Sequence, residues 1–382
     1  MSTIGAEAAW KLVALSSIHD VAADMPDVDV DEILAEVDWD VVLVRAMRHR
    51  LMPRLADLLI RSERMAATPK PIRRALVLAL NTNRFTCAAT TRETSEVVAA
   101  LQAGGVAVAC TKGVVFQQSL YGGFGGRDFR DIDLMIQESD KQTAAEILLS
   151  IGYEAHLELD LLTNTTVTRS RRELMMYRMF PDHLPHFARP VEGHIMPFHD
   201  VDVCFNFTWH GAGWNIPMNE VLAELDTVEV RAGEETFGLP SLSAPYDFLF
   251  VATHIFRETW FERKISGEAI RLGQFADLWR LWQRLDDPAR KTVAALIDRY
   301  GVAPPIAWAC HHADGVFGSR IADGLGLGDY CDSAWLRSIG AVDGSYLEWH
   351  GDMREWLRSG KPPALSPMSE PRFAAQARVA LS

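Results

Sequence analysis

The chain has few cysteines and no pair of them at a spacing typical of a metal site. Its five cysteines are at positions 87, 110, 204, 310 and 331. The number is odd, the intervals are wide and Cys-x-x-Cys is absent, so neither a disulfide framework nor a zinc knuckle is predicted. No apolar run approaches the ~20 residues of a membrane helix, and the first residues lack the features of a signal peptide. We therefore expect a cytoplasmic protein with reduced thiols and no membrane partner.

Positive charge is also scarce. The chain has 38 Lys and Arg residues against 51 Asp and Glu residues, which gives a formal net charge of −13. Binding to a nucleic-acid backbone needs a basic surface, so a nucleic acid is not expected as the main partner. The hydrophobic content of 48% and the charged content of 23% are ordinary for a folded protein. With 382 residues, the chain can bury a core without metals or disulfides and has room for two or three domains.

The order of local signals predicts an α+β protein in four parts. These are an N-terminal helical region, a core, a C-terminal helical domain and a Pro-rich, loosely ordered tail, at residues 1–90, 91–242, 243–360 and 361–382. In the first part, Asp38 is placed to cap a helix. Thr90 and Glu93 have the spacing of a capping box, which predicts that another helix begins at Thr90.

Four segments of the central part have the length or the alternation of β-strands. They are residues 106–110, 131–136, 153–160 and 201–207. Helical patterns follow the first two of these strands. Strands alternating with helices in this way predict a mixed β-sheet core, flanked along the chain by helical regions.

The most informative motif is Asp131-Ile132-Asp133. Alternate side chains of a strand share a face, so both carboxylates point the same way while Ile132 points to the core. At ~4 Å and an effective dielectric of about 20, two such charges repel by roughly 4 kcal/mol. A cation between them removes this cost, and magnesium, which takes carboxylates and substrate phosphates as ligands, is the natural candidate. The alternative is a pair of exposed edge-strand aspartates, which deter edge pairing.

Four of the five residues in 122–126 are glycines, yet they match no phosphate-binding loop. No Lys-Ser/Thr follows them, and the run lies after a helix and before a strand, so the P-loop and dinucleotide patterns both fail. We interpret these glycines as a slack connection to Asp131. Lys112-Gly113 is the better phosphate element, because it lies where a strand gives way to a helix and glycine allows close backbone approach.

Taken in order, these motifs resemble the nucleotidyltransferase superfamily that includes DNA polymerase beta and the aminoglycoside nucleotidyltransferases. The closer resemblance is to the bacterial uncharacterised nucleotidyltransferase family, whose core reads Lys-Gly, Tyr, Arg, Asp-Ile-Asp-Leu, a helix and Gly-Tyr. The corresponding residues here are Lys112-Gly113, Tyr121, Arg127, Asp131-Ile132-Asp133-Leu134 and Gly152-Tyr153. The segments 38–55, 247–260 and 275–283 resemble the family's flanking helices, so the resemblance covers most of the chain.

The resemblance implies a nucleotidyltransferase core and a role for each matched residue. Asp131 and Asp133 would hold magnesium, with two ions expected. Lys112 and Gly113 would lie near the triphosphate of a nucleoside triphosphate co-substrate. Arg127 would support the site or contact a phosphate.

The third carboxylate of the superfamily maps to Asp202 in the segment VDVCFNF, as a metal ligand or general base. Asp200, on the same strand face, is a rival for this position. The family has a histidine where this chain has Cys204. The wider superfamily has Gly-Ser where this chain has Lys112-Gly113, so a serine contact to the phosphates is missing.

Two further clusters leave other chemistry open. The first contains five histidines near several aspartates, at positions 183, 186, 194, 199 and 210. It allows either a zinc site or a loop over the active site with histidines near the acceptor, although Pro185 prevents a helical pair of ligands. The second is a basic patch of arginines, at positions 169, 171, 172 and 178. This patch is either a solvated face or a clamp for an anionic substrate.

We therefore expect a magnesium-dependent nucleotidyltransferase that moves a nucleoside monophosphate from a triphosphate to a small-molecule or peptide acceptor and releases pyrophosphate. Specialised metabolism and antibiotic modification are candidate settings. Two alternatives stay open. One is a relative that binds a nucleotide or a partner without catalysis, and the other is a toxin-like transferase that modifies tRNA or protein.

Overall fold

The computed structural model describes residues 3–20, 28–160, 163, 165–172, 174–175, 182–191, 196–262 and 270–377. The chain divides into two compact units. Unit 1 contains Met1–Asn81, Gly211–Asn215 and Ala244–Ser382, and unit 2 contains Thr82–His210 and Ile216–Ser243. The four domain ranges predicted from the sequence stay predictions, and each unit is described by itself below.

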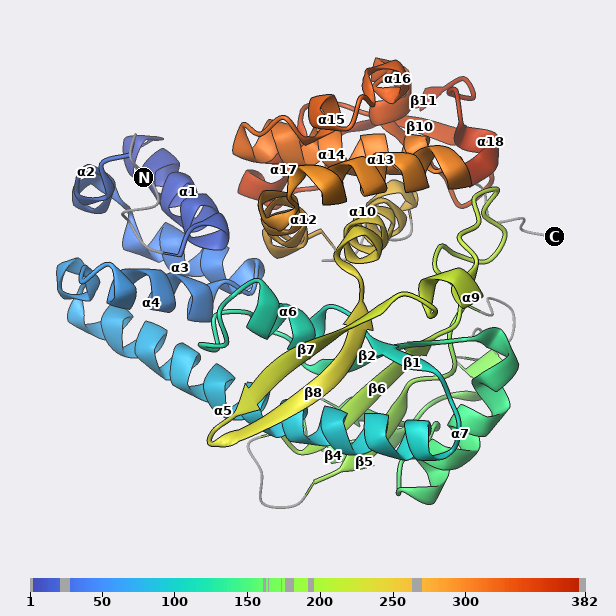
Figure 1. Cartoon of the computed structure of the whole chain (residues 1–382). Helices are drawn as coiled ribbons and strands as arrows, with labels where there is room; N and C mark the ends of the chain where they lie inside the picture. The colour runs from blue at the N-terminus through green and yellow to red at the C-terminus, as the bar shows by residue number, and fades with distance from the viewer. Residues whose placement is uncertain are drawn as a thin grey trace. The chain divides into compact units, whose positions relative to one another are not determined.

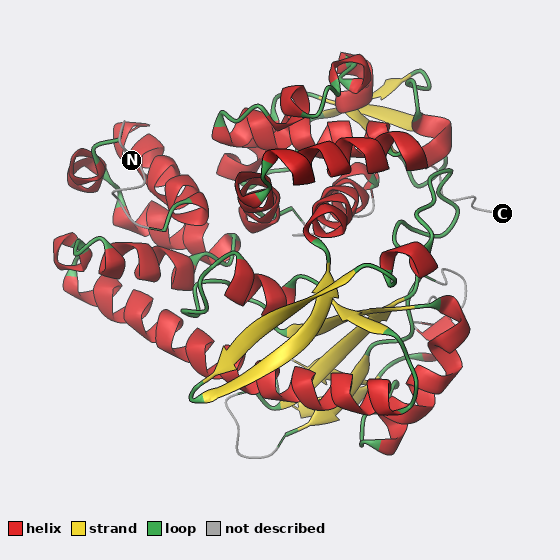
Figure 2. Cartoon of the chain, viewed as in Figure 1, coloured by secondary structure: helices red, strands yellow, loops and turns green. Residues whose placement is uncertain are grey.

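A six-stranded mixed sheet forms the centre of unit 2, with the strand order β5-β6-β2-β1-β8-β7 (Figures 1 and 2). The strands of this sheet are β1 Val108–Cys110, β2 Asp131–Ile136, β5 Phe187–Pro190, β6 Phe198–Cys204, β7 Leu225–Ala232 and β8 Glu235–Leu242. The pairs β2–β6 and β1–β8 are parallel, and the other neighbours are antiparallel. The predicted α+β class with a mixed sheet and helical flanks is thereby confirmed.

The remaining elements of unit 2 are helices and one separate hairpin. They are the second part of α5 Lys70–Ala103, α6 Gly113–Ser119, η3 Glu138–Asp140, α7 Lys141–Ser150, β3 Leu157–Asp160, β4 Thr165–Thr168 and α9 Met218–Val221. The predicted strand at 153–160 is therefore only half formed, and it pairs with β4 outside the main sheet.

The helix predicted to begin at Thr90 does not begin there. α5 runs without interruption from Lys70 to Ala103, so Thr90 and Glu93 lie inside it. Glu93 is 6% exposed, and its carboxylate accepts hydrogen bonds from Tyr153 and Arg189 rather than capping a helix. The Glu93 side chain therefore makes tertiary contacts instead of the local capping contact that the sequence pattern predicts.

Glu93 also shows which face of the sheet α5 covers. His199 of β6 is buried, and its Nε2 lies 3.8 Å from Glu93 Oε2. Side chains alternate along β6, so Asp200 and Asp202 point to the opposite face. Helix α5 therefore covers the face of the sheet opposite to the one that carries Asp200 and Asp202.

Unit 1 is mainly helical (Figure 2). Its helices are α1 Thr3–Ile18, α2 Val30–Glu36, α3 Trp39–Arg48, α4 Met52–Arg61, η2 Met65–Ala67, the first part of α5, α10 Ala244–Trp260, α12 Leu272–Arg284, α13 Asp287–Tyr300, α14 Ala303–Phe317, α15 Ile321–Gly324, η4 Gly328–Tyr330, α16 Ser333–Leu336, α17 Met353–Ser359 and α18 Ala374–Ala377. A small antiparallel sheet has the strands β9 Ser338–Gly340, β10 Tyr346–Trp349 and β11 Leu365–Met368. No described helix has the length and apolar character that crossing a membrane requires.

Two expectations about unit 1 have different outcomes. The predicted cap is confirmed, because Asp38 Oδ1 accepts hydrogen bonds from the amides of Asp40 and Val41. The expectation of a loosely ordered tail is wrong for the part that the structure describes, since β11 pairs with β10 and Ala374 and Ala377 are fully buried. The strand tolerates Pro367 because β11 lies at the edge of its sheet.

A buried histidine joins three helices of unit 1. His49 Nε2 lies 3.0 Å from Leu357 O, and His49 Nδ1 accepts a hydrogen bond of 3.2 Å from the amide of Leu272. The first nitrogen therefore donates and the second accepts, which only the neutral ring can do. Burial lowers the pKa of His49 to about 4, and the nearby Arg48 acts in the same direction.

This arrangement predicts that unit 1 loses stability in mild acid. The folded pKa of His49, about 4, lies below the value of about 6.5 in an unfolded chain, so the unfolded state binds the proton first as the pH falls. The free energy of unfolding should therefore fall between about pH 6.5 and pH 4, by about 3 kcal/mol in total. Denaturation at a series of pH values measures this free energy. His49→Gln should flatten this dependence, whereas His350→Gln, at an exposed position, should leave it unchanged; equal slopes in all three proteins would contradict the prediction.

Candidate active site on strands β2 and β6

Two neighbouring parallel strands bring four carboxylates together. β2 and β6 pair so that Asp131 lies beside Asp200 and Asp133 lies beside Asp202. The residues between them are buried on the other face, and they are Ile132, Leu134, Val201 and Val203. Because side chains alternate along both strands, all four aspartates share one face of the sheet. The rivalry between Asp200 and Asp202 for the third carboxylate is therefore not decided by orientation.

Lys112 supplies a cation to this acidic face. Its Nζ lies 3.3 Å from Asp133 Oδ1, and the two side chains are 17% and 13% exposed. Burial alone would lower the pKa of Lys112, but Asp133, Asp131 and Asp202 more than offset that effect, so the pKa is raised and the side chain stays charged.

The backbone at Lys112 is in an unusual conformation. Its φ is +47° and its ψ is −117°, a region that residues with a Cβ rarely occupy and that costs on the order of 1–3 kcal/mol. The next residue, Gly113, begins α6, and a Cβ there would lie 3.4 Å from Asp131 O and 3.8 Å from Asp133 Oδ2. Strained backbone persists where the surrounding structure demands it, and here it brings the turn of Lys112-Gly113 directly against the two aspartates.

Two histidines lie against the carboxylates of β6. His186 Nδ1 is 3.4 Å from Asp200 Oδ2, and His186 Nε2 is 3.6 Å from Asp202 Oδ2. His183 Nδ1 is 3.6 Å from Asp202 Oδ1. Burial lowers the pKa of His186, but the attraction of Asp202 and Asp200 outweighs it and raises the pKa to about 9. The ring is thus an imidazolium at neutral pH.

Burial makes the ionisation of Asp133 unfavourable. Burial raises its pKa to about 7, and the neighbouring Asp131 and Asp202 add to the rise, while Lys112 and Arg127 oppose it. The cost of burying the Asp133 carboxylate is therefore not fully offset by Lys112 at 3.3 Å. A further cation bound at this carboxylate would favour its charged form.

Arg127 packs against the start of α6, and its charge also acts on Asp133. Its Nη1 lies 3.5 Å from Gly113 O, and its guanidinium lies 5.6 Å from the ring centre of Phe116 and 6.0 Å from that of Phe129. Its amide donates to Gln117 Oε1 at 2.8 Å. These contacts fit a supporting role for Arg127, and its predicted phosphate contact stays a prediction.

The interpretation of the glycine run as slack is wrong. Gly122, Gly123 and Gly125 have φ values between +71° and +79°, which glycine adopts without strain. Asn83 donates to Gly125 O at 2.6 Å, and Arg84 Nε donates to Phe124 O at 2.9 Å. The loop is a series of tight turns fixed to α5, and it delivers β2 in a defined position. No local signal in the sequence identifies Asn83 as an anchor.

The other predicted clusters are not assembled as expected. Of the five histidines, His183 and His186 reach the site, His199 faces α5, and the His210 side chain is exposed, while His194 lies outside the described residues. Of the arginines, Arg171 and Arg172 are exposed and Arg178 lies outside the described residues. Arg169 donates to Leu157 O at 2.9 Å, and its charge opposes protonation of His186, so among the described arginines of the patch it is the one that lies near the site.

The donor set of the four aspartates fits a hard divalent cation. Carboxylate oxygens are the ligands that magnesium prefers, and Asp200 Oδ1 is buried without a hydrogen bond from the described residues. Within those residues, no three His, Cys, Asp or Glu side chains are already grouped as a metal site. Among the described residues, the Lys112 ammonium contacts Asp133, the His186 imidazolium contacts Asp200 and Asp202, and the His183 ring also lies against Asp202. A metal bound at Asp133 would therefore compete with the Lys112 ammonium.

Comparison with known proteins gives the family to which this chain belongs. Residues 35–318, most of the chain, match the family described as uncharacterised nucleotidyltransferase. The chain belongs to this family, and the resemblance drawn from the Lys-Gly and Asp-Ile-Asp motifs is confirmed at that level. No curated protein matches the chain significantly.

Repulsion among the carboxylates predicts that Asp131→Asn stabilises the protein in the absence of divalent cations. Asp131 lies beside Asp200 and forms no ion pair with a described residue, so the substitution removes the repulsion from Asp200 and loses only the longer-range attraction to Lys112. After screening by solvent, we expect the free energy of unfolding to rise by about 1 kcal/mol. Denaturation in the presence of a chelator measures it. Asp226→Asn, at an exposed position on β7, is the matched control, and a destabilised Asp131→Asn would contradict the prediction.

Proposed function

We propose that this protein is a magnesium-dependent nucleotidyltransferase that transfers a nucleoside monophosphate from a nucleoside triphosphate to a small-molecule or peptide acceptor. The observation that supports it most is the pairing of β2 with β6, which places Asp131, Asp133, Asp200 and Asp202 on one face. Lys112-Gly113 approaches the same face through a strained turn. Membership of the nucleotidyltransferase family supports the reaction class.

In this proposal the aspartates take two roles. Asp131 and Asp133 would hold magnesium from β2, and Asp202, beside Asp133 on β6, would either add a ligand to the metal or act as the general base. When bound, magnesium supplies charge neutralisation of the triphosphate and polarisation of its phosphorus atoms. Lys112 leaves Asp133 and pairs with the triphosphate, and the close approach of Gly113 leaves room for the phosphates next to the strand.

The transfer step then follows from the position of the remaining groups. The acceptor oxygen or nitrogen attacks the α-phosphorus, the bond to the bridging oxygen breaks, and pyrophosphate leaves with the electron pair. Asp202 accepts the acceptor's proton, directly or through a water molecule. His186 and His183, which lie 3.6 Å from its two oxygens, hold the carboxylate in place. Most of the rate enhancement comes from positioning and from electrostatic stabilisation.

A second candidate function is nucleotide or partner binding without transfer. One observation favours it: Lys112 and His186 already contact the carboxylates that the reaction needs for metal. If Lys112 and His186 stayed bound to Asp133 and Asp202, these carboxylates would have no position left for magnesium. The two candidates differ in whether magnesium enters the site with the nucleotide.

The first experiment is a thermal shift with each of the four ribonucleoside triphosphates, with and without magnesium. Ligand at ~100 times its dissociation constant adds about 2.7 kcal/mol to the free energy of unfolding, which raises the melting temperature visibly. We expect a magnesium-dependent shift in the wild type that disappears in Asp133→Ala. Asp226→Asn is the control and should behave as the wild type. A shift that keeps its magnesium dependence in Asp133→Ala would show that the metal assignment is wrong.

Competition between Lys112 and the metal predicts opposite effects of Lys112→Gln on two ligands. Removing the ammonium should tighten the binding of a divalent cation alone, because its competitor at Asp133 is gone, and should weaken triphosphate binding, each by about tenfold. Electron paramagnetic resonance of free manganese measures the first effect, and the thermal shift measures the second.

Lys141→Gln, at a lysine of α7 that pairs with Glu138, is the control for this experiment and should change neither affinity. If Lys112→Gln weakens manganese binding as well, Lys112 positions the aspartates rather than competing for them, and the competition is contradicted.

A further inference from the structure

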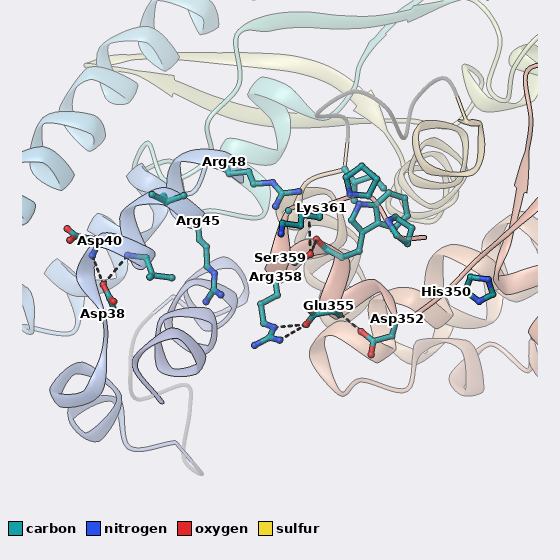
Figure 3. Close-up of a pocket in the computed structure, with 18 residues that line it drawn as sticks. Asp38, Asp40, Arg45, Arg48, His350, Asp352, Glu355, Arg358, Ser359 and Lys361 are labelled. Carbon is teal, nitrogen blue, oxygen red and sulfur yellow. Dashed lines mark hydrogen bonds and ion pairs between the residues drawn. The ribbon is translucent and has the colours of Figure 1, made fainter. Parts of the chain in front are cut away.

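The charges of a pocket in unit 1 balance one another. The pocket has a volume of about 1240 Å³ and lies between α3 and the segment from His350 through α17 to Pro363 (Figure 3). Its lining contains four acids and four cations, and they are Asp38, Asp40, Asp352, Glu355, Arg45, Arg48, Arg358 and Lys361. Such a lining does not indicate the charge of a ligand. The acidic face of β2 and β6 differs, because among the described residues its carboxylates outnumber the cations in contact with them.

The carboxylates of this face form two cross-strand pairs. Asp133 and Asp202 form one pair, and Asp131 and Asp200 form the other. Neighbouring strands of a sheet lie about 4.8 Å apart. Two carboxylates that extend from neighbouring positions on one face can therefore reach a common cation, and magnesium takes oxygen ligands at about 2.0–2.1 Å.

The pair of Asp133 and Asp202 already has contacts with basic side chains. Lys112 Nζ lies 3.3 Å from Asp133 Oδ1. Asp202 has a histidine nitrogen 3.6 Å from each of its oxygens, which is His183 Nδ1 at Oδ1 and His186 Nε2 at Oδ2. A metal ion that binds Asp202 must therefore displace one of these rings.

The two histidines extend from backbone that is fixed against the strand of Asp202. His183 forms an isolated bridge with Cys204, and His186 directly precedes β5, which pairs with β6. A histidine side chain is also shorter and stiffer than that of Lys112, whose carbon stem is long and flexible. The rings are thus less able than the ammonium to give way to a metal.

The pair of Asp131 and Asp200 is more open. Asp131 forms no ion pair with a described residue, and its attraction to Lys112 acts at longer range. Asp200 Oδ2 lies 3.4 Å from His186 Nδ1, but Asp200 Oδ1 is buried and has no hydrogen bond from the described residues. A buried carboxylate oxygen without a donor is costly, and a cation beside it removes that cost.

The turn of Lys112-Gly113 lies beside the same pair. A Cβ at Gly113 would be 3.4 Å from Asp131 O and 3.8 Å from Asp133 Oδ2. The segment to which the proposed function assigns the triphosphate is therefore next to Asp131. Magnesium takes one or two carboxylates together with substrate phosphates and water. A cation here needs fewer protein ligands than the groups of three that are missing from the described residues.

We infer that Asp200, rather than Asp202, is the β6 ligand of the divalent cation and shares it with Asp131. Asp133 joins these ligands when Lys112 moves to the triphosphate. Asp202 then lies beside the metal and is held by the two histidines. This inference rests on the proposed function, because the divalent cation is the one which that reaction requires.

The test compares two substitutions that remove the same charge from the same face of β6. We expect Asp200→Asn to raise the dissociation constant of Mn²⁺, the probe for Mg²⁺, by at least about tenfold, because it removes a ligand. Asp202→Asn removes only a neighbouring charge and should raise this constant by no more than about threefold. Electron paramagnetic resonance of free manganese measures both constants on the full chain, with manganese alone and with a non-hydrolysable triphosphate present. Asp131→Asn should match Asp200→Asn, and Asp226→Asn, at an exposed position of β7, should match the wild type.

A second variant separates ligation from the loss of charge. Asp200→Cys replaces a hard oxygen ligand with a soft sulfur ligand, so the affinity for Cd²⁺ relative to Mn²⁺ should rise by at least about tenfold over the wild type. Asp226→Cys adds a thiol at the exposed position of β7 and should leave this ratio unchanged. Thermal unfolding without metal shows that each variant is folded.

The outcomes distinguish this inference from the proposed function. A loss of manganese affinity in Asp202→Asn that equals or exceeds the loss in Asp200→Asn would overturn the inference and leave the proposed function standing. An unchanged ratio of Cd²⁺ to Mn²⁺ affinity in Asp200→Cys would overturn the inference as well. A wild type that binds no manganese, alone or with the triphosphate, would overturn both.

Discussion

The register between β2 and β6 is the constraint on which the candidate site depends. It sets Asp131 beside Asp200 and Asp133 beside Asp202, so that charges which repel are held on neighbouring strands. Alternation buries Ile132 and Val201 on the opposite face, and a shift of one residue would exchange the two sets and place carboxylates in the core. The apolar residues therefore fix the register, and this register holds the carboxylates of β2 and β6 close enough to repel one another. Lys112 and the His186 imidazolium relieve this repulsion, and in the proposed reaction magnesium would add to their effect.

This constraint explains the strained and buried groups around the strands. Lys112 has a positive φ, and its ammonium lies at Asp133. Gly113, the next residue, is so close to β2 that a Cβ there would be in van der Waals contact with Asp131 O. On the other face, Glu93 of α5 binds Tyr153 and contacts β5 and β6. The face of the sheet that α5 covers is thus held by buried contacts, and the opposite face carries the charged aspartates. A functional site supported by a rigid scaffold has this arrangement.

The sequence predicts the parts of this arrangement that arise from local patterns. The strand at 131–136 follows from the alternation of acids and apolar residues, and the cap at Asp38 follows from its position before an amphipathic helix. Long-range contacts decide the rest. The sequence pattern predicts that Glu93 caps a helix, whereas in the structure Tyr153 and Arg189 bond to it. The glycines at 122–126 are interpreted as a flexible connection, whereas in the structure Asn83 anchors their loop. The sequence places His186 in a histidine cluster near several aspartates, but the antiparallel pairing of β5 with β6 is needed to bring it to Asp202.

The central claim is that these aspartates support cleavage between the α- and β-phosphates of a nucleoside triphosphate. The most direct measurement is phosphorus NMR of the products formed from each triphosphate with magnesium, in the presence of a small-molecule and peptide extract as the source of acceptor. We predict pyrophosphate together with a nucleoside monophosphate or its adduct, and we predict no cleavage with Asp202→Asn. Release of inorganic phosphate from the γ-position, or pyrophosphate formed equally by Asp202→Asn, would contradict the account.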